Sequence, residues 1–222
     1  MLDLSISRLL LSIPAILIAL TLHELSHGYV AYKLGDTTAK SQGRLSLNPL
    51  KHLDPIGALF LLIVGFGWAK PVPVNPYAFK NKEKGMALVA IAGPASNLLM
   101  ALMGGIGLLL INNAYMSAAV AGSGSGTVLY YLAFFCMYFI QINIVLMVFN
   151  LIPLPPLDGS RVLAAFLSAE LRYRYYQIEQ FGMIIMMAMC LPIFGGSSII
   201  SLVISKPVTA ISSWIYSLAG IV

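Results

Sequence analysis

His23, Glu24 and His27 form an HExxH motif that directly follows an apolar run, in the stretch ALTLHELSHGYVAYKLGD. On an α-helix, residues four apart share one face, so both imidazoles can reach a single metal ion. The glutamate between them projects close by and can act as a general base on a metal-activated water. Three titratable groups at the end of an apolar helix are costly in hydrocarbon unless they have partners. The motif therefore predicts zinc-dependent hydrolysis, and the alternative is a helix end at the membrane interface whose histidines bind nothing.

A catalytic zinc site usually has three protein ligands, so one more side chain must come from elsewhere in the chain. The strongest candidate is Asp158, which follows a long apolar span and the proline-rich sequence PLPPL. Prolines break helix geometry, and irregular backbone at membrane depth is tolerated where it lines a cavity. His52 is the second candidate, although an ordinary loop histidine is the more common case. The remaining carboxylates lie mostly in loops or basic stretches, where a solvated charge is expected: Asp3, Asp36, Asp54, Glu83, Glu170 and Glu179.

The composition predicts an integral membrane protein whose helices hold these side chains. Of 222 residues, 59% are hydrophobic and 9% are charged, whereas a soluble domain carries about 25% charged residues. The length suits a single domain over residues 1–222 with about five to six spans of about 20 residues each. The first apolar run is expected to stay as a span, because no small-residue cleavage site follows it. We expect clear spans at 9–34, 85–111 and 128–150, another from about residue 178, and a final segment, 197–222, that crosses once or bends back at Lys206.

Two features between the first and second clear spans depart from a plain helical pattern. Residues 44–48 and 72–75 alternate in character, which indicates short half-buried strands. Pro71 and Pro73 cannot donate to a ladder, so a strand there would lie at a sheet edge. The apolar segment 55–68 is short for a span and better suits a re-entrant segment. The predicted fold is thus an all-α polytopic membrane protein with a small β element and a re-entrant segment.

The charge pattern predicts the orientation of the chain in the cell membrane. The net charge is +5, and residues 112–127 carry no charge, while basic residues gather between the first and second clear spans and after the third. By the positive-inside bias the two basic regions are cytoplasmic, so the histidines lie within the membrane nearer its cytoplasmic face. The basic residues form no long run interleaved with aromatic residues, which argues against nucleic acid as a partner. Cys136 and Cys190 stand alone in apolar stretches and indicate packing, not a zinc or redox pair.

These motifs resemble those of the site-2 protease family of intramembrane zinc metalloproteases. Besides HExxH at 23–27, NLIPLPPLDG at 150–159 resembles the family's proline-rich D-G element, and GPASN at 93–97 matches its G-x-x-x-N element. The resemblance covers most of the chain, from about residue 20 to residue 159, and is to the compact form without PDZ or CBS domains. The segments GRLSLNPLKHLDPIG and AKPVPVNPYAF resemble the sheet and membrane-dipping segments of that compact branch.

The resemblance implies one zinc ion per chain, bound by the two histidines of HExxH and by Asp158. It makes the glutamate of the motif, Glu24, the catalytic base. It also implies that Asn150 lies beside the site, where it orients the substrate or the developing oxyanion. For Asn97 the same substrate-binding role is predicted, and hydrogen bonding between membrane helices is an equally good interpretation.

The function that the resemblance implies is hydrolysis of peptide bonds in or near transmembrane segments of other membrane proteins. Its partners are then those segments, the lipid bilayer and, for substrate selection, a regulatory membrane partner. One alternative is a polytopic membrane metal-binding or transport protein without peptidase activity, because intramembrane His and carboxylate groups also mark ion pathways. An inactive scaffold is disfavoured, since the ligand set and the base are all present.

Overall fold

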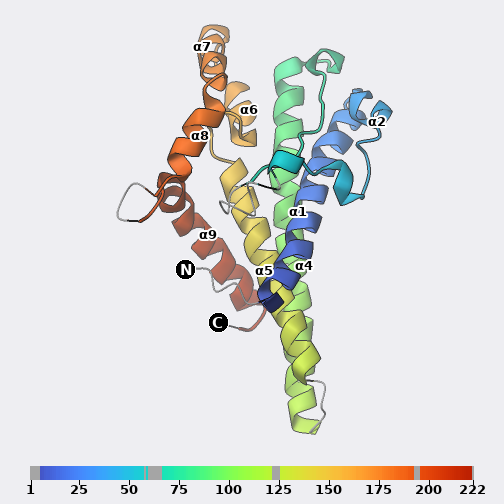
Figure 1. The fold of residues 1–222 in the computed structure, drawn as a ribbon. Coiled ribbons are helices and arrows are strands. Elements are labelled where there is room, and N and C mark those ends of the chain that lie inside the picture. Colours follow the sequence, from blue (N-terminus) through green and yellow to red (C-terminus); the bar gives the residue numbers. More distant parts are fainter. Residues whose placement is uncertain (1–5, 58, 60–66, 122–125, 193–195, 222) are drawn as a thin grey trace.

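The computed structural model describes residues 6–57, 59, 67–121, 126–192 and 196–221, and most of these residues are helical (Figure 1). Four helices are long and apolar enough to cross a membrane, so an all-α membrane protein is confirmed. The elements in chain order are α1 (Ile6–Lys33), α2 (Thr38–Ser41), η1 (Pro49–Lys51), η2 (Pro76–Ala78), α4 (Lys82–Ala121), α5 (Gly126–Asn150), α6 (Asp158–Ala164), α7 (Ala169–Glu179), α8 (Gly182–Cys190) and α9 (Ile199–Leu218).

The four long apolar helices in the described part of the chain are fewer than the five to six spans predicted. The segment from about residue 178 is divided between the end of α7 and α8, which has only 9 residues. At about 1.5 Å per residue, α8 is about 14 Å long, less than half of a hydrocarbon core of about 30 Å. The last segment forms the single helix α9, with Pro207 inside it. The second span is longer than predicted, because α4 continues to Ala121.

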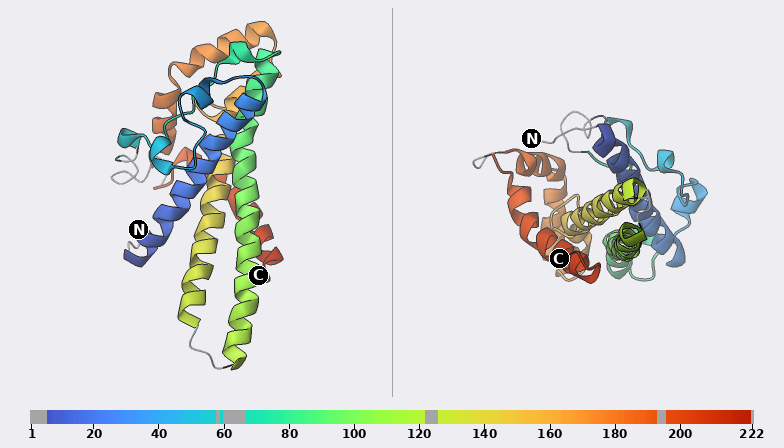
Figure 2. Two further views of the ribbon diagram at one scale, coloured as in Figure 1. Left: turned by 90° about the vertical axis from the view of Figure 1, so that its right-hand side faces the viewer. Right: turned by 90° about the horizontal axis from the view of Figure 1, so that it is seen from below.

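The central pair of the bundle is formed by α4 and α5. Figure 2 shows them antiparallel and side by side, continuing past the other helices. A Cβ on Gly104 of α4 would lie 2.9 Å from Cγ1 of Ile140 on α5, and one on Gly105 would lie 2.7 Å from Cγ2 of Ile215 on α9. Small residues at such contacts let membrane helices approach closely. Both isoleucines are fully buried, and α1 packs against the same pair of helices.

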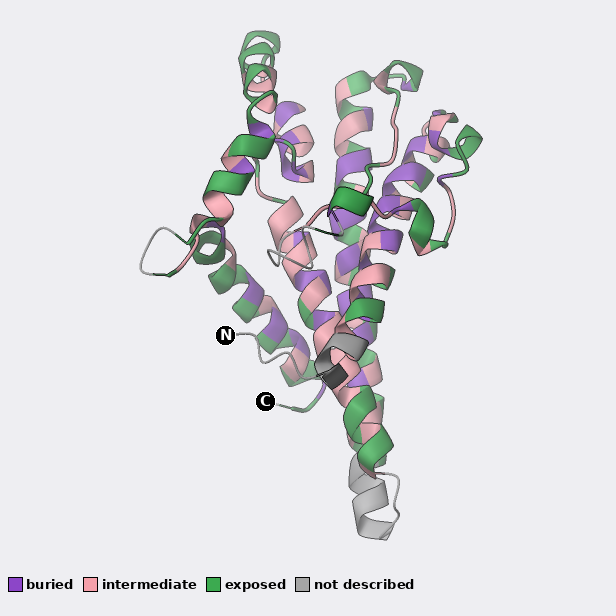
Figure 3. Cartoon of the chain, in the orientation of Figure 1, coloured by how far each residue is buried: buried purple, intermediate pink, exposed green. Residues whose placement is uncertain are grey.

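Buried side chains concentrate where α1, α4 and α5 meet, while their outer faces expose apolar side chains (Figure 3). On α4, for example, Leu99 is 63% exposed and Met103 is 68% exposed, as expected for side chains that face lipid. Polar side chains are buried inside instead: Thr21, His23, Glu24, His27, Asn97 and Asn143. Lipid cannot hydrogen-bond to polar groups, so these side chains must satisfy one another or a bound ligand.

The predicted β element is wrong for the residues to which it was assigned. Residues 44–48 and 72–75 form no strand, and an isolated antiparallel bridge joins Leu53 to Ala69 nearby. The predicted re-entrant segment, 55–68, falls largely outside the described residues.

Backbone groups that would form hydrogen bonds to a neighbouring β-strand are bound by a side chain instead. Arg44, the first residue of the segment 44–48, donates from Nη2 to the carbonyl of Lys70 at 2.7 Å and from Nη1 to that of Pro71 at 3.0 Å. Pro71 and Pro73 have no N–H to offer a neighbouring strand. The alternating pattern therefore corresponds to an extended segment that is held by side chains.

Candidate active site

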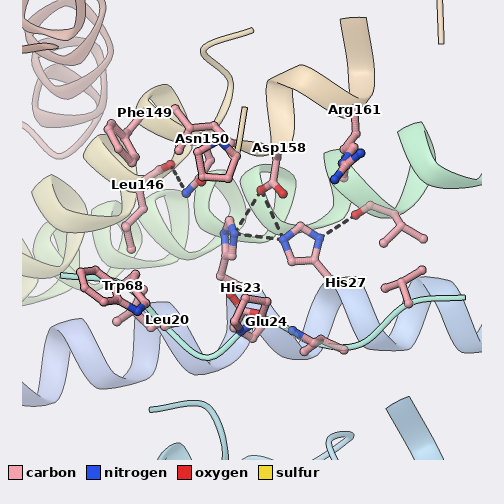
Figure 4. A pocket seen from close by; sticks show the side chains of 18 of the residues that line it. Leu20, His23, Glu24, His27, Trp68, Leu146, Phe149, Asn150, Asp158 and Arg161 are labelled. Atoms are coloured by element: carbon pink, nitrogen blue, oxygen red, sulfur yellow. Dashed lines mark hydrogen bonds and ion pairs between the residues drawn. The ribbon is translucent and has the colours of Figure 1, made fainter. Parts of the chain in front are cut away.

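The predicted metal ligands converge in one cluster (Figure 4). His23 and His27 lie one turn apart on α1, with their Nε2 atoms 3.0 Å from each other. Asp158 is the first residue of α6, and its Oδ2 lies 3.2 Å from each of these nitrogens. A zinc ion bound tetrahedrally at about 2.0–2.1 Å has ligand atoms about 3.3 Å apart. The cluster therefore has the dimensions of a zinc coordination shell.

The turn after α5 brings the carboxylate of Asp158 back toward α1. The prolines of the PLPPL turn cannot continue α5, because they lack an N–H and clash with the preceding turn of a helix. Leu157 is extended, with φ −70° and ψ 156°, and the next residue begins α6. A Cβ on Gly159 would collide with the carbonyl of Leu151, so this close approach requires glycine. The sequence LDG thus aims a carboxylate from a second part of the chain at the histidines.

On the other side, α4 supports the imidazole rings. His27 Nδ1 lies 2.7 Å from the carbonyl oxygen of Val89, which can only accept, so Nδ1 carries the proton and Nε2 presents a lone pair. One turn further along α4, a Cβ on Gly93 would lie 2.5 Å from both His23 Cε1 and His27 Nε2. Glycine at this position leaves the room that both rings occupy.

A chain of hydrogen bonds through two buried asparagines sets the tautomer of His23. Asn143 Nδ2 donates to the carbonyl of Phe139 at 2.8 Å, which turns its Oδ1 toward Asn97. Asn97 Nδ2 donates to that oxygen at 2.8 Å, and its own Oδ1 lies 2.5 Å from His23 Nδ1. Because the carbonyl at the far end can only accept, His23 Nδ1 must be the donor at the near end.

With both imidazoles neutral and their Nδ1 atoms donating, the cluster presents three electron-pair donors to one another. Both Nε2 atoms carry lone pairs, and Oδ2 of Asp158 is buried without a hydrogen bond from the residues that the structure describes. Three lone pairs at this spacing repel one another unless a cation joins them. Two imidazoles and one carboxylate are a ligand set typical of catalytic zinc, so the residues present fit that metal.

Beside the cluster, a cavity of about 460 Å³ contains the general-base candidate. Glu24 is 9% exposed, and its Oε2 accepts the backbone N–H of Val72 at 3.0 Å. The walls of the cavity are mostly apolar and include Leu20, Trp68, Val74, Leu146, Phe149 and Met186. The arrangement combines a metal-ligand set, a carboxylate base and apolar room for a bound chain.

Comparison with known proteins identifies the family. The model of peptidase family M50 matches residues 11–193, which include the whole cluster. The chain belongs to peptidase family M50. YwhC of Bacillus subtilis is 46% identical over 174 residues, which are 78% of this chain and 77% of that protein. Rip2 of Mycolicibacterium smegmatis is 32% identical over 186 residues, which are 81% of this chain and 66% of Rip2, and both relatives are named as putative zinc metalloproteases. No solved structure matches the chain.

The predicted family and enzyme class are thereby confirmed: this M50 peptidase is a zinc metalloprotease of the site-2 protease family. Asn150 lines its cavity and donates from Nδ2 to the carbonyl of Leu146 at 3.0 Å. Asn97 is fully buried and engaged on both sides of its amide, which favours the helix-bonding interpretation over substrate contact. His52 is also buried, with Nε2 donating to the carbonyl of Ser46 at 2.7 Å, and it lies outside the metal-ligand cluster.

Three supporting groups of this M50 peptidase were not found from the sequence. Asn143 carried a usable signal, since it is a polar side chain in an apolar span and lies two turns before Asn150 on the same face. The carbonyl of Val89 and the N–H of Val72 are backbone groups, whose partners depend on the tertiary fold.

Proposed function

We propose that this M50 peptidase hydrolyses peptide bonds in or near transmembrane segments of other membrane proteins. The observation that carries the proposal is that the ligand cluster opens to an apolar cavity lined in part by α1, α4 and α5, each of which is long enough to span a membrane. Hydrolysis of a water-soluble substrate does not require an active site among membrane-spanning helices. A transmembrane segment, in contrast, matches the apolar lining.

We assign roles in hydrolysis to the residues that line the cavity. When bound, zinc supplies Lewis acidity that polarises a carbonyl and lowers the pKa of a water to about 7. Glu24 takes a proton from the attacking water and passes it to the leaving amine. Its Oε2 is occupied by the N–H of Val72, so Oε1 remains for the proton. Asn150 uses one N–H on the carbonyl of Leu146, and its second N–H is available to the substrate backbone or the oxyanion.

The bound substrate is an extended segment of chain, because a helix keeps its peptide groups in its own hydrogen bonds. Residues 67–74 run along one wall of the cavity and provide extended backbone beside which such a segment can lie. We further propose that the site lies in the cell membrane nearer the cytoplasmic face. The basic residues of the loop between α1 and α4 support this orientation.

The experiment that tests this function compares membrane peptides from cells that produce the wild type or Glu24→Gln. We expect the wild type to cut one or more membrane proteins within or beside a transmembrane segment, and the variant to leave them intact. Glu170→Gln is a suitable control, since this exposed glutamate on α7 pairs with Arg174. Cuts confined to soluble loops would contradict the proposal. Zinc flux into liposomes by a protein without peptidase activity would instead favour a transporter.

A further inference from the structure

The general base of HExxH does not share the supports of its two neighbours. Glu24 follows His23 directly, so their side chains leave α1 about 100° apart. The groups that hold the imidazoles lie on α4 and α5, whereas the hydrogen bond that the structure gives Glu24 comes from the loop between α1 and α4. That bond is the N–H of Val72 on Oε2, at 3.0 Å.

The donor belongs to a short extended segment, residues 70–75, which we call the strap. Its sequence is KPVPVN, so Val72 stands between two prolines. Neither proline has an N–H, and both restrict φ, so the one amide between them is presented by a stiff stretch of chain. Val72, Pro71 and Val74 line the same cavity as Glu24, so the strap lies beside both the base and the room for the proposed substrate.

A buried arginine fixes the first end of the strap. Arg44 is 7% exposed and donates to the carbonyls of Lys70 and Pro71. The N–H of Lys70 donates to the carbonyl of His52 at 2.8 Å, so both backbone groups of Lys70 are held. Two parallel bonds from one planar guanidinium constrain direction as well as distance, which a lysine ammonium cannot reproduce.

A buried carboxylate fixes the other end. Asp36 is 1% exposed, and its Oδ2 accepts the N–H of Asn75 at 2.6 Å while Oδ1 accepts that of Thr38 at 2.9 Å. Burial raises the pKa of Asp36, but the hydrogen bonds from Thr38 and Asn75 outweigh it and lower the pKa below its ordinary value. The carboxylate therefore stays charged at neutral pH and makes strong, charge-assisted bonds.

We propose that the strap, held by Arg44 and Asp36, positions the carboxylate of Glu24 through the N–H of Val72. Arg44 and Asp36 are then positioning residues, which act on catalysis without contact with the substrate. The inference rests on the role of Glu24 as the general base in the proposed function. The strap controls the base and leaves the metal ligands unchanged.

The decisive pair of variants is Val72→Pro and Val72→Ala. Both alter the side chain, but only proline removes the N–H that bonds Glu24. We expect Val72→Pro to lower kcat by about 10- to 100-fold, as small misplacements of catalytic groups do, with KM close to that of Val72→Ala. Zinc stoichiometry and zinc retention against a chelator should equal those of the wild type. A kcat within about twofold of Val72→Ala, or loss of zinc, would overturn the inference.

A second variant tests the anchor without touching the strap. Arg44→Lys keeps the charge but loses the two-bond contact, and we expect kcat to fall about 10-fold with zinc binding unchanged. In the Val72→Pro background the same substitution should have little further effect, because both act through one amide. Independent, additive losses would contradict the proposed path.

Wild type and Glu24→Gln, assayed on the same substrate, separate the two hypotheses. If Glu24→Gln cleaves normally, the role of Glu24 fails and the strap inference fails with it. If Glu24→Gln is inactive while Val72→Pro matches Val72→Ala, the proposed function stands and the strap inference alone is wrong.

Discussion

The two imidazoles and the carboxylate of HExxH are neighbours on α1, yet different parts of the molecule hold them. His23 and His27 are fixed by Asn97 and the carbonyl of Val89 on α4, and Asn97 is held in turn by Asn143 on α5. Glu24 is fixed by a loop that itself depends on buried charges. The difference teaches that metal binding and proton transfer have separate structural supports, so each should be open to change without the other.

The largest effect is expected when the base itself is changed. Glu24→Gln retains shape and the bond from Val72, but it cannot accept a proton, so kcat should fall by about 10³-fold. Zinc stoichiometry should stay at that of the wild type, since no metal ligand changes. Measurement of kcat and of metal content in the same purified protein checks the expected loss of activity and the expected retention of zinc. A variant that loses its zinc would show that the two supports are not separate.

A smaller effect, on zinc affinity instead of kcat, is expected when the hydrogen-bond chain from Asn143 through Asn97 to His23 is broken. Asn97→Leu removes the acceptor of His23 Nδ1 and should weaken zinc affinity by about 10- to 100-fold. Chelator competition, followed by metal analysis, gives the affinity. Asn112→Leu is the matched control on the same helix, because the side chain of Asn112 donates to the carbonyl of Gly220, away from the metal ligands. Equal affinities in the two variants would remove Asn97 from the support of the metal site.

The smallest effect is a pH-dependent change in stability at the far end of the strap. The pKa of Asp36 is lowered in the folded protein, so its contribution to stability is complete above its ordinary value of 3.8 and is lost as the pH falls through the lower folded value. Asp36→Asn should cost about 1 kcal/mol near neutral pH, since it removes charge from two hydrogen bonds.

Thermal unfolding of the two proteins in detergent across the acidic range measures this difference. The melting temperatures should begin to converge as the pH falls below about 3.8 and should meet below the lower pKa of the folded protein, where the carboxyl of folded Asp36 is neutral as well. A gap that widens at acid pH would mean that Asp36 is neutral in the folded protein.

The sequence was most informative for reactive side chains that are energetically unfavourable inside a membrane. Titratable groups in an apolar chain need partners. Prolines after a membrane span indicate irregular backbone, which can direct a side chain inward toward such a group. The residue pattern alone therefore favoured Asp158 as the third ligand. Hydropathy also located α1, α4 and α5. It predicted more spans than the four long apolar helices of the described residues, because an apolar stretch near residue 185 is broken into short helices.

The pairing of particular groups in the site could not be predicted from the sequence, for a physical reason. Asn97 and Asn143 are 46 residues apart and meet only because α4 and α5 pack antiparallel. The amide of Val72 has no side-chain signature at all, and its role follows from the strap. The alternating pattern of the strap predicts a strand. An extended segment has the same residue pattern whether its N–H groups donate to a neighbouring strand or to the carboxylate of a side chain.

The central claim is that His23, His27 and Asp158 together hold one zinc ion. Metal analysis of purified wild type, Glu24→Gln and Asp158→Ala, each dialysed against a weak chelator, tests it most directly. We predict one zinc per chain in the first two proteins and little or none in Asp158→Ala, since two imidazoles alone do not form a closed set. A full equivalent of zinc in Asp158→Ala would contradict the account.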